Sequence, residues 1–278
     1  MKPMLVFQTD FTYKEGAVCA MYGVVKSVDR TLEIIDGTHE LPNYDIWSAS
    51  YRLYQSMEFW PKDTIFISVV DPGVGTKRRA CVAKTLTGYT IVTPDNGTLT
   101  HVKRTMGIAE VREIDESVNR LQHTSGVSVF HGRDLFGYCA ARLASGVITY
   151  EEVGPAYPVE EIVELPVAEA SLESGAVKGI FEIDDPNFGN LWTNIPRELF
   201  TKASFDYGDT LRVSVSHEGK KVYEGSLLYE KSFGYAKKGD VMIYNNELMR
   251  VAMAVVQGSL VQSHGLGYGA DWQVSFSK

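Results

Sequence analysis

Short apolar runs alternate with amphipathic stretches over the first 150 residues of the chain. The runs at Met4–Gln8, Leu32–Ile35, Thr64–Val70, Ala80–Lys84 and Thr90–Thr93 are rich in Val, Ile, Thr or Phe and end at turn residues. We expect each of them to be a β-strand. Helical patterns fill the gaps between the strands. This alternation is typical of βαβ units and predicts an α/β domain with a mostly parallel central sheet.

Three segments repeat apolar residues at three- and four-residue spacing, which predicts helices with one face against the sheet. The first covers residues 17–28, the second Asp45–Glu58 and the third Asp134–Ser145. Gly146 stands where a glycine would end the third helix. The expected helices therefore alternate with the expected strands along the domain.

The pattern changes after Tyr150–Pro166, a proline- and glutamate-rich segment without periodicity that resembles a connection between domains. Beyond it, polar turns join further expected strands without long helices between them, which describes a small β-barrel. The length of 278 residues also favours two domains. We predict an α/β domain over residues 1–165 and a β-barrel domain over residues 166–278. The strands expected in the second domain are Val177–Ile183, Leu211–Val215, Val222–Leu228, Val241–Tyr244 and Val251–Val256.

Composition narrows the class of protein. A net charge of −8 argues against a nucleic-acid surface, because phosphate binding needs concentrated Lys and Arg. Cys19, Cys81 and Cys139 lie far apart and match neither a disulfide framework nor zinc-ligand spacing, so we expect buried thiols in a reducing compartment. The apolar run before Asp10 is too short for a signal peptide, and no segment approaches the roughly 20 apolar residues of a membrane span. We expect a soluble, cytoplasmic protein that binds neither nucleic acid nor membrane.

Acidic residues follow several of the expected strands. Asp10, Asp71 and Asp95 each begin a turn at a strand end. An aspartate in such a place usually caps a helix or makes a turn, and we keep that interpretation for Asp95 in the turn sequence Asp-Asn-Gly. Ligands bind outside the carboxyl ends of parallel strands, however, so several acids there together indicate one crevice.

The glycine-rich loop after Asp71 lacks the endings of a phosphate loop and of a dinucleotide motif, so we do not expect a nucleotide triphosphate. The loop instead delivers Arg78, which can fold back over Asp71. His131 precedes a predicted helix and is followed by a glycine that permits close approach, although a lone histidine is more often structural than catalytic. No histidine spacing suggests a metal site. The other histidines lie in polar segments without partners visible in the sequence: His39, His101, His123, His217 and His264.

The passage from Asp184 to Asn194 in the second domain combines aromatic and amide side chains in one strand-loop-strand unit. Aromatic rings and amides together can bind a purine, by stacking and by hydrogen bonds to its edges. The alternative is a polar loop with Phe188 and Trp192 in the domain core. The residues alone leave both interpretations open.

Five motifs, taken together and in order, resemble the S-adenosylmethionine hydrolase (SAM hydroxide adenosyltransferase) family. They are TDF at residues 9–11, VVDPGVGT at 69–76, PDNG at 94–97, FHGRD at 130–134 and FGNxxTN at 188–194, so the resemblance covers nearly the whole chain. The family is related to bacterial fluorinases and chlorinases. The resemblance implies a homotrimer that binds its substrate between the first domain of one subunit and the second domain of its neighbour, without a cofactor or a metal.

The resemblance also implies site residues. The family's Asp-Arg-His triad falls on Asp71, Arg78 and His131, around the attacking water, and its ribose-binding aspartate falls on Asp10. Thr12 replaces a glycine that family members commonly carry, and Val256 replaces an asparagine. Glu15 replaces an aspartate, one methylene shorter. The further substrate-binding positions are Phe11, Glu15, Tyr44, Pro72, Phe130, Gly132, Asp184, Phe188, Asn190, Trp192, Ser232, Phe233, Glu247 and Val255.

The implied reaction is hydrolysis of S-adenosylmethionine to adenosine and methionine by attack of water on the ribose 5′ carbon. The sulfonium leaves as a neutral thioether, so the enzyme has to position the water and accept its proton, a task we assign to the triad collectively. One alternative is halide adenosyl transfer, but the related halogenases carry a tyrosine in place of Asp71 and lack the histidine, and a carboxylate there would repel a halide. The other is a non-catalytic sensor, against which the intact triad argues.

Overall fold

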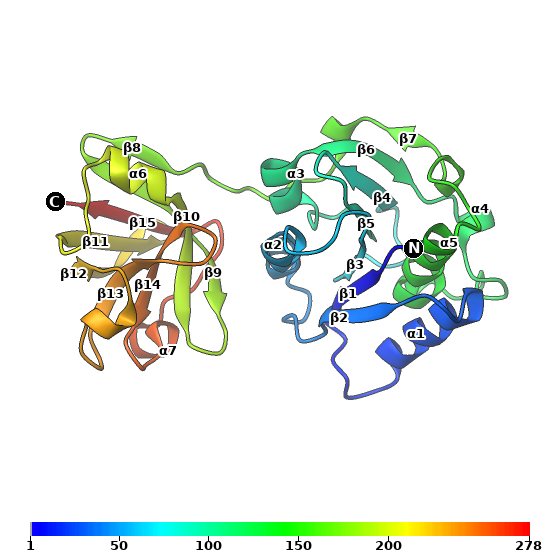
Figure 1. The fold of residues 1–278 in the computed structure, drawn as a ribbon, viewed down its shortest axis with the longest axis horizontal. Coiled ribbons are helices and arrows are strands. Elements are labelled where there is room, and N and C mark those ends of the chain that lie inside the picture. The colour runs from blue at the N-terminus through cyan, green and yellow to red at the C-terminus, as the bar shows by residue number, and fades with distance from the viewer. Residues whose placement is uncertain (1) are drawn as a thin grey trace. The chain divides into compact units, whose positions relative to one another are not determined.

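The structure is a computed structural model that describes residues 2–278, and the chain forms two compact units (Figure 1). The first unit ends at Leu165 and the second spans Pro166–Lys278. Each unit contains its own hydrophobic core. None of the helices in residues 2–278 combines the length and the apolar character that crossing a bilayer requires.

The first unit is built on a seven-stranded sheet whose two halves differ in strand direction. One half consists of four parallel neighbours in the order β2 (Ile34–Thr38), β1 (Leu5–Thr9), β3 (Ile65–Val69) and β5 (Thr90–Pro94). Beyond β5 the sheet continues with antiparallel pairings through β4 (Ala80–Thr85), β6 (Ile108–Glu113) and β7 (Ala156–Tyr157). The predicted α/β class is confirmed, and β6 and β7 are strands that the sequence pattern did not predict.

Helices cover both faces of this sheet (Figure 1). Because successive side chains of a strand point to opposite faces, Leu5 and Phe7 of β1 enter one core and Val6 enters the other. The first core includes α1 (Ala17–Val28) and α5 (Tyr138–Ser145), and the second includes α2 (Ile46–Met57) and α3 (Thr100–Met106). The remaining helical segments are α4 (Glu116–Asn119), the π-helical turn η1 (Gly132–Gly137) and the 3₁₀ turns η2 (Glu151–Val153) and η3 (Val159–Glu161).

Three expectations for the first unit need correction. The strand expected at 32–35 is Ile34–Thr38 instead, and Leu32 is a buried core residue ahead of the strand. The helix expected from Asp134 begins instead with the π-helical turn, and only α5 is α-helical, ending at Gly146 with a left-handed backbone as predicted. Cys19 is exposed, since it lies on the outer side of α1, whereas the other two cysteines are buried as expected.

The second unit contains a closed β-barrel of seven strands, which confirms the predicted barrel. The sheet closes because β10 pairs with both β9 and β14. The pairing of β12 with β13 is parallel, and every other pairing described in residues 2–278 for this sheet is antiparallel. Around the barrel the strands are β9 (Ala176–Asp185), β10 (Asn190–Pro196), β14 (Arg250–Val255), β13 (Val241–Asn245), β12 (Lys220–Tyr229), β11 (Thr210–His217) and β15 (Trp272–Ser277), with β8 (Ser171–Glu173) beside β9.

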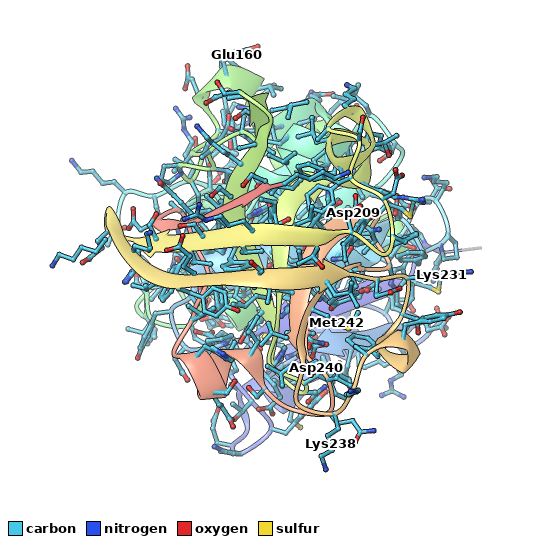
Figure 2. The ribbon with its side chains drawn as sticks, turned by 90° about the vertical axis from the view of Figure 1, so that its left-hand side faces the viewer. Glu160, Asp209, Lys231, Lys238, Asp240 and Met242 are labelled. Atoms are coloured by element: carbon cyan, nitrogen blue, oxygen red, sulfur yellow. The ribbon has the colours of Figure 1, made fainter. Side chains whose placement is uncertain are left out.

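Alternating side chains of these strands fill the barrel. Leu211, Val213 and Val215 of β11 are buried, while the residues between them are partly or fully exposed. Figure 2 shows Lys238 and Asp240 on the turn before β13 and Met242 within that strand. Three short helical segments connect the strands: α6 (Arg197–Lys202), η4 (Phe233–Tyr235) and α7 (Leu260–His264).

Candidate active site

A cavity of about 300 Å³ lies in the first unit, at the carboxyl ends of β1 and β3. This is the edge of a parallel sheet where ligands are expected to bind. Pro72 is not among the lining residues, and Asn43, Val69, Val74 and Val129 line the cavity without having been predicted. The predicted residues that line it are Asp10, Phe11, Glu15, Tyr44, Asp71, Phe130, His131 and Gly132.

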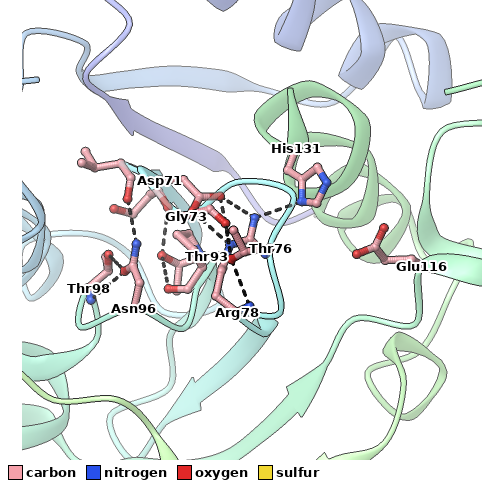
Figure 3. A network of polar contacts seen from close by, with 12 residues as sticks. Asp71, Gly73, Thr76, Arg78, Thr93, Asn96, Thr98, Glu116 and His131 are labelled. Carbon is pink, nitrogen blue, oxygen red and sulfur yellow. Dashed lines mark hydrogen bonds and ion pairs between the residues drawn. The ribbon is translucent and has the colours of Figure 1, made fainter. Parts of the chain in front are cut away.

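Asp71 and His131 line this cavity, and Arg78, which is not among the lining residues, joins them in one hydrogen-bonded network (Figure 3). The Nε of Arg78 donates to the two carboxylate oxygens of Asp71 at 3.0 and 3.1 Å, and its Nη2 forms an ion pair with the same carboxylate. That Nη2 also lies 2.9 Å from Nδ1 of His131. The side chains of Asp71 and Arg78 are only 5% and 10% exposed, so water screens their attraction weakly.

A tight turn brings Arg78 back onto the aspartate seven residues before it. The backbone N–H of Val74 donates to the carbonyl of Asp71, and that of Thr76 donates to the carbonyl of Gly73. Gly75 has a φ of 74°, and a Cβ at this position would lie 2.5 Å from the carbonyl oxygen of Ser128. Only glycine therefore lets this turn lie against the loop that leads to His131.

The protonation state of His131 follows from its neighbours. Burial lowers the pKa of His131, and the positive charge of Arg78 lowers it further, so the ring is neutral at pH 7. Since a guanidinium can only donate, Nδ1 is the acceptor and the ring proton is on Nε2. Among the described residues, this buried Nε2 has no hydrogen-bond partner.

The position of His131 depends on the π-helical turn that follows it. Gly132 begins this turn, and a Cβ there would lie 3.1 Å from the ring of Phe11. Phe11 in turn packs edge-to-face against Phe130, with 5.8 Å between ring centres. The glycine therefore allows the aromatic wall of the cavity and the histidine to occupy neighbouring positions.

Asp10 ends up beside the network because it directly follows β1. One carboxylate oxygen accepts a 2.9 Å hydrogen bond from the backbone N–H of Tyr44. Burial raises the pKa of Asp10, and the negative charge of Asp71 raises it as well, while the Tyr44 hydrogen bond lowers it. Tyr44 itself is 72% exposed and has a φ of 66°. The other predicted acid, Glu15, accepts a hydrogen bond from the N–H of Ala17 at the start of α1.

The residues predicted in the second unit lie on β9, β10 and β14, in the turn between β9 and β10, and on the segments that follow β12 and β13. Trp192 of β10 is buried and donates from Nε1 to the hydroxyl of Tyr244, an unpredicted residue whose ring also packs against Phe233 at 4.8 Å. Phe188 is 67% exposed in the β9–β10 turn, so the alternative that placed both Phe188 and Trp192 in the core holds for Trp192 only. The other predicted positions are Asp184 on β9, Asn190 on β10, Ser232 before η4, Glu247 after β13 and Val255 at the end of β14.

The chain is similar to known proteins of one family over most of its length. The chain matches the model of the SAM hydroxide adenosyltransferase N-terminal domain over residues 5–154 and that of the C-terminal domain over residues 179–273. It is 37% identical to an (R)-S-adenosyl-L-methionine hydrolase of Salinispora tropica, over 96% of this chain and 95% of that protein. A fluorinase of Actinoplanes sp. is 26% identical, over 96% of this chain and 95% of its own.

Solved structures show the same fold. A crystal structure of an uncharacterized conserved protein from Thermotoga maritima superimposes with a TM-score of 0.89 at 34% identity, covering 99% of this chain and 100% of that one. The resemblance drawn from the five motifs is thereby confirmed. The chain belongs to the SAM hydroxide adenosyltransferase family.

Proposed function

We propose that the protein hydrolyses S-adenosylmethionine to adenosine and methionine. The network of Asp71, Arg78 and His131 at the wall of the cavity carries this proposal. The water oxygen forms a bond to the ribose 5′ carbon, the bond from that carbon to sulfur breaks with its electron pair going to sulfur, and one proton of the water passes to the enzyme. Because the leaving group is a neutral thioether, it needs no proton and no cofactor is required.

The charge of the cavity suits this substrate. Three carboxylates, those of Asp10, Glu15 and Asp71, line it together with the rings of Phe11 and Phe130. Carboxylates attract the positive sulfonium centre, and aromatic rings attract a cation through their π-face. A halide would meet the carboxylate of Asp71 instead, so water is the better-suited nucleophile.

We propose that the carboxylate of Asp71 accepts the proton that the attacking water loses. Neither nitrogen of His131 is free to accept it, since Nδ1 accepts from Arg78 and Nε2 already carries the ring proton. Each carboxylate oxygen of Asp71 has two lone pairs, so it can accept a proton while Arg78 remains bound. His131 then positions Arg78 through the hydrogen bond at Nδ1, and Arg78 holds the carboxylate of Asp71 in place.

We further propose that the second unit supplies the contacts to adenine and to the methionine carboxylate. No lysine or arginine is among the residues that line the first-unit cavity, so the negative carboxylate of methionine needs donors from elsewhere. Asn190 has an amide that can read a purine edge, and Phe233 is partly exposed beside Tyr244. A homotrimer in which these residues come from a neighbouring subunit is the arrangement that the family resemblance favours.

Product analysis tests the reaction. Purified protein incubated with S-adenosylmethionine, without added metal and without halide, is expected to release adenosine and methionine in equal amounts. Chromatography of the nucleosides gives the readout, and Asp71→Asn, a side chain of nearly the same size, is the control that removes the base. Accumulation of 5′-chloro-5′-deoxyadenosine in chloride buffer would replace the proposal by halide transfer, and tight binding without turnover would replace it by a sensor.

A further inference from the structure

A second buried histidine, His39, lies next to the segment that carries Asp10. It directly follows β2, and Thr9 ends the neighbouring parallel strand β1, so both residues are at the same edge of the sheet. The side chain of His39 is fully buried. Its Nδ1 lies 2.8 Å from the hydroxyl oxygen of Thr9, and its Nε2 lies 2.8 Å from the hydroxyl oxygen of Tyr22 and 3.3 Å from a carboxylate oxygen of Asp36.

These contacts form a directed series of hydrogen bonds. The backbone N–H of Phe11 can only donate, and it donates to the hydroxyl oxygen of Thr9 at 3.1 Å. The carboxylate of Asp36 can only accept, so the proton of the neutral His39 ring is on Nε2 and Nδ1 accepts from the Thr9 hydroxyl. Burial lowers the pKa of His39, which agrees with this neutral form, although Asp36 opposes the shift. The series runs from the carboxylate of Asp36 to the backbone beside Asp10.

Two backbone hydrogen bonds also join the His39–Leu41 segment to residues 9–12. The N–H of Thr12 donates to the His39 carbonyl at 2.8 Å, and the N–H of Leu41 donates to the carbonyl of Thr9 at 3.3 Å. Thr12 has a φ of 58°, a left-handed conformation that a β-branched residue adopts only under constraint. The turn that presents Asp10 and Phe11 to the cavity is therefore fixed from both ends by the His39 region.

We propose that His39 is a positioning residue for substrate binding: its ring holds the Asp10–Thr12 turn so that the Asp10 carboxylate is oriented toward the sugar hydroxyls before the nucleoside arrives. This inference rests on the proposed function, since it takes adenosine as a product. His39 itself is not among the residues that line the cavity. Its contribution is to reduce the ordering that binding would otherwise require, which is how a preorganised site gains affinity.

The test compares His39→Gln with His101→Gln. His101 is also buried and hydrogen-bonded through Nδ1, to Ser50, but it lies outside the cavity lining. Both variants are expected to lower the melting temperature. Only His39→Gln should raise the dissociation constant of adenosine and the KM for S-adenosylmethionine, by about tenfold, with kcat changed less than about threefold. Calorimetric titration with adenosine and steady-state kinetics give these values.

Thr9 provides a second route if His39→Gln does not fold. Thr9→Val removes the hydroxyl at nearly constant shape and should weaken adenosine binding as His39→Gln does, whereas Thr9→Ser should restore it. The double variant should lose no more affinity than either single one, because both changes break the same series. Adenosine affinity that stays at the wild-type level in His39→Gln or Thr9→Val would overturn the proposal. Absence of adenosine binding and turnover in the unaltered protein would instead refute the proposed function.

Discussion

At the scale of single residues, a histidine that accepts a hydrogen bond from an arginine differs from a general base. The two roles predict different effects of substitutions at His131 on kcat. Asp71→Asn and His131→Ala should each lower kcat by at least about 10²-fold. His131→Asn should retain activity within about tenfold of the unaltered protein, because its amide oxygen takes the position of Nδ1 and can still accept from Arg78. Adenosine formation under saturating substrate measures this. If His131→Asn were as inactive as His131→Ala, the ring would be the base and the role of Asp71 would change.

The same assignment fixes the direction of the pH dependence. Burial and Arg78 hold the pKa of His131 below its usual value of 6.5, so the unfolded chain takes up this proton at higher pH than the folded protein does. The stability that neutral His131 contributes is present above pH 6.5 and is lost as the pH falls. Activity should fall in the same direction, because a proton on Nδ1 would face the donor of Arg78. The melting temperature and kcat, each measured above and below pH 6.5, show whether stability and activity both fall as the pH falls.

The sequence predicted some site residues and not others for physical reasons. Asp71 follows a recognisable strand, and Arg78 lies two residues after the family motif at 69–76. Asn43 looks like an ordinary turn residue, and Tyr244 looks like a core residue of a strand, since its contact with Trp192 depends on β14 lying between β10 and β13, where Ala252 pairs with both residues. The left-handed backbone of Thr12 is a conformation that glycine adopts more readily, but one sequence does not reveal a backbone angle.

At the scale of elements, the turn at 71–78 and the loop before His131 meet at Gly75. A Cβ there would collide with the Ser128 carbonyl, and the left-handed φ alone costs a non-glycine residue about 1–2 kcal/mol. Gly75→Ala should therefore lower the melting temperature and, by separating Arg78 from His131, lower kcat by about tenfold or more. Gly126→Ala in the same loop is the control, because its Cβ would meet no atom within 4 Å. Equal kcat in the two variants would show that this contact does not position the network.

Elements whose pattern is local were the most predictable. Each of β1 and β3 is buried along its whole length and is mostly apolar, whereas β6 alternates buried apolar positions with exposed and half-buried ones. The π-helical turn cannot be distinguished from an α-helix by apolar spacing over only six residues. Closure of the barrel depends on β10 pairing with both β9 and β14, and the second of these pairings joins residues far apart in the sequence.

At the scale of the whole molecule, the division of the chain into two units separates the groups that act on the water from those proposed to bind adenine. Each unit has its own core, so residues 1–165 should fold when expressed alone. This fragment keeps Asp10 and the Asp71–Arg78–His131 network but lacks the aromatic and amide groups around Trp192. It should therefore bind adenosine at least about tenfold more weakly than the full chain and should not turn over S-adenosylmethionine.

The measurement is the adenosine-induced rise in melting temperature, which reports binding to the folded state, followed by calorimetric titration. The control is the full chain carrying Asn190→Ala, which retains both units and loses one of the amides proposed to read the purine. Its affinity should fall between those of the full chain and the fragment, since the remaining contacts of the second unit persist. The mass of the full chain in solution, compared with its 30.9 kDa monomer, tests the expected trimer in the same samples. Binding of adenosine by residues 1–165 at the strength of the full chain would place all determinants in the first unit and would remove the reason for a site shared between subunits.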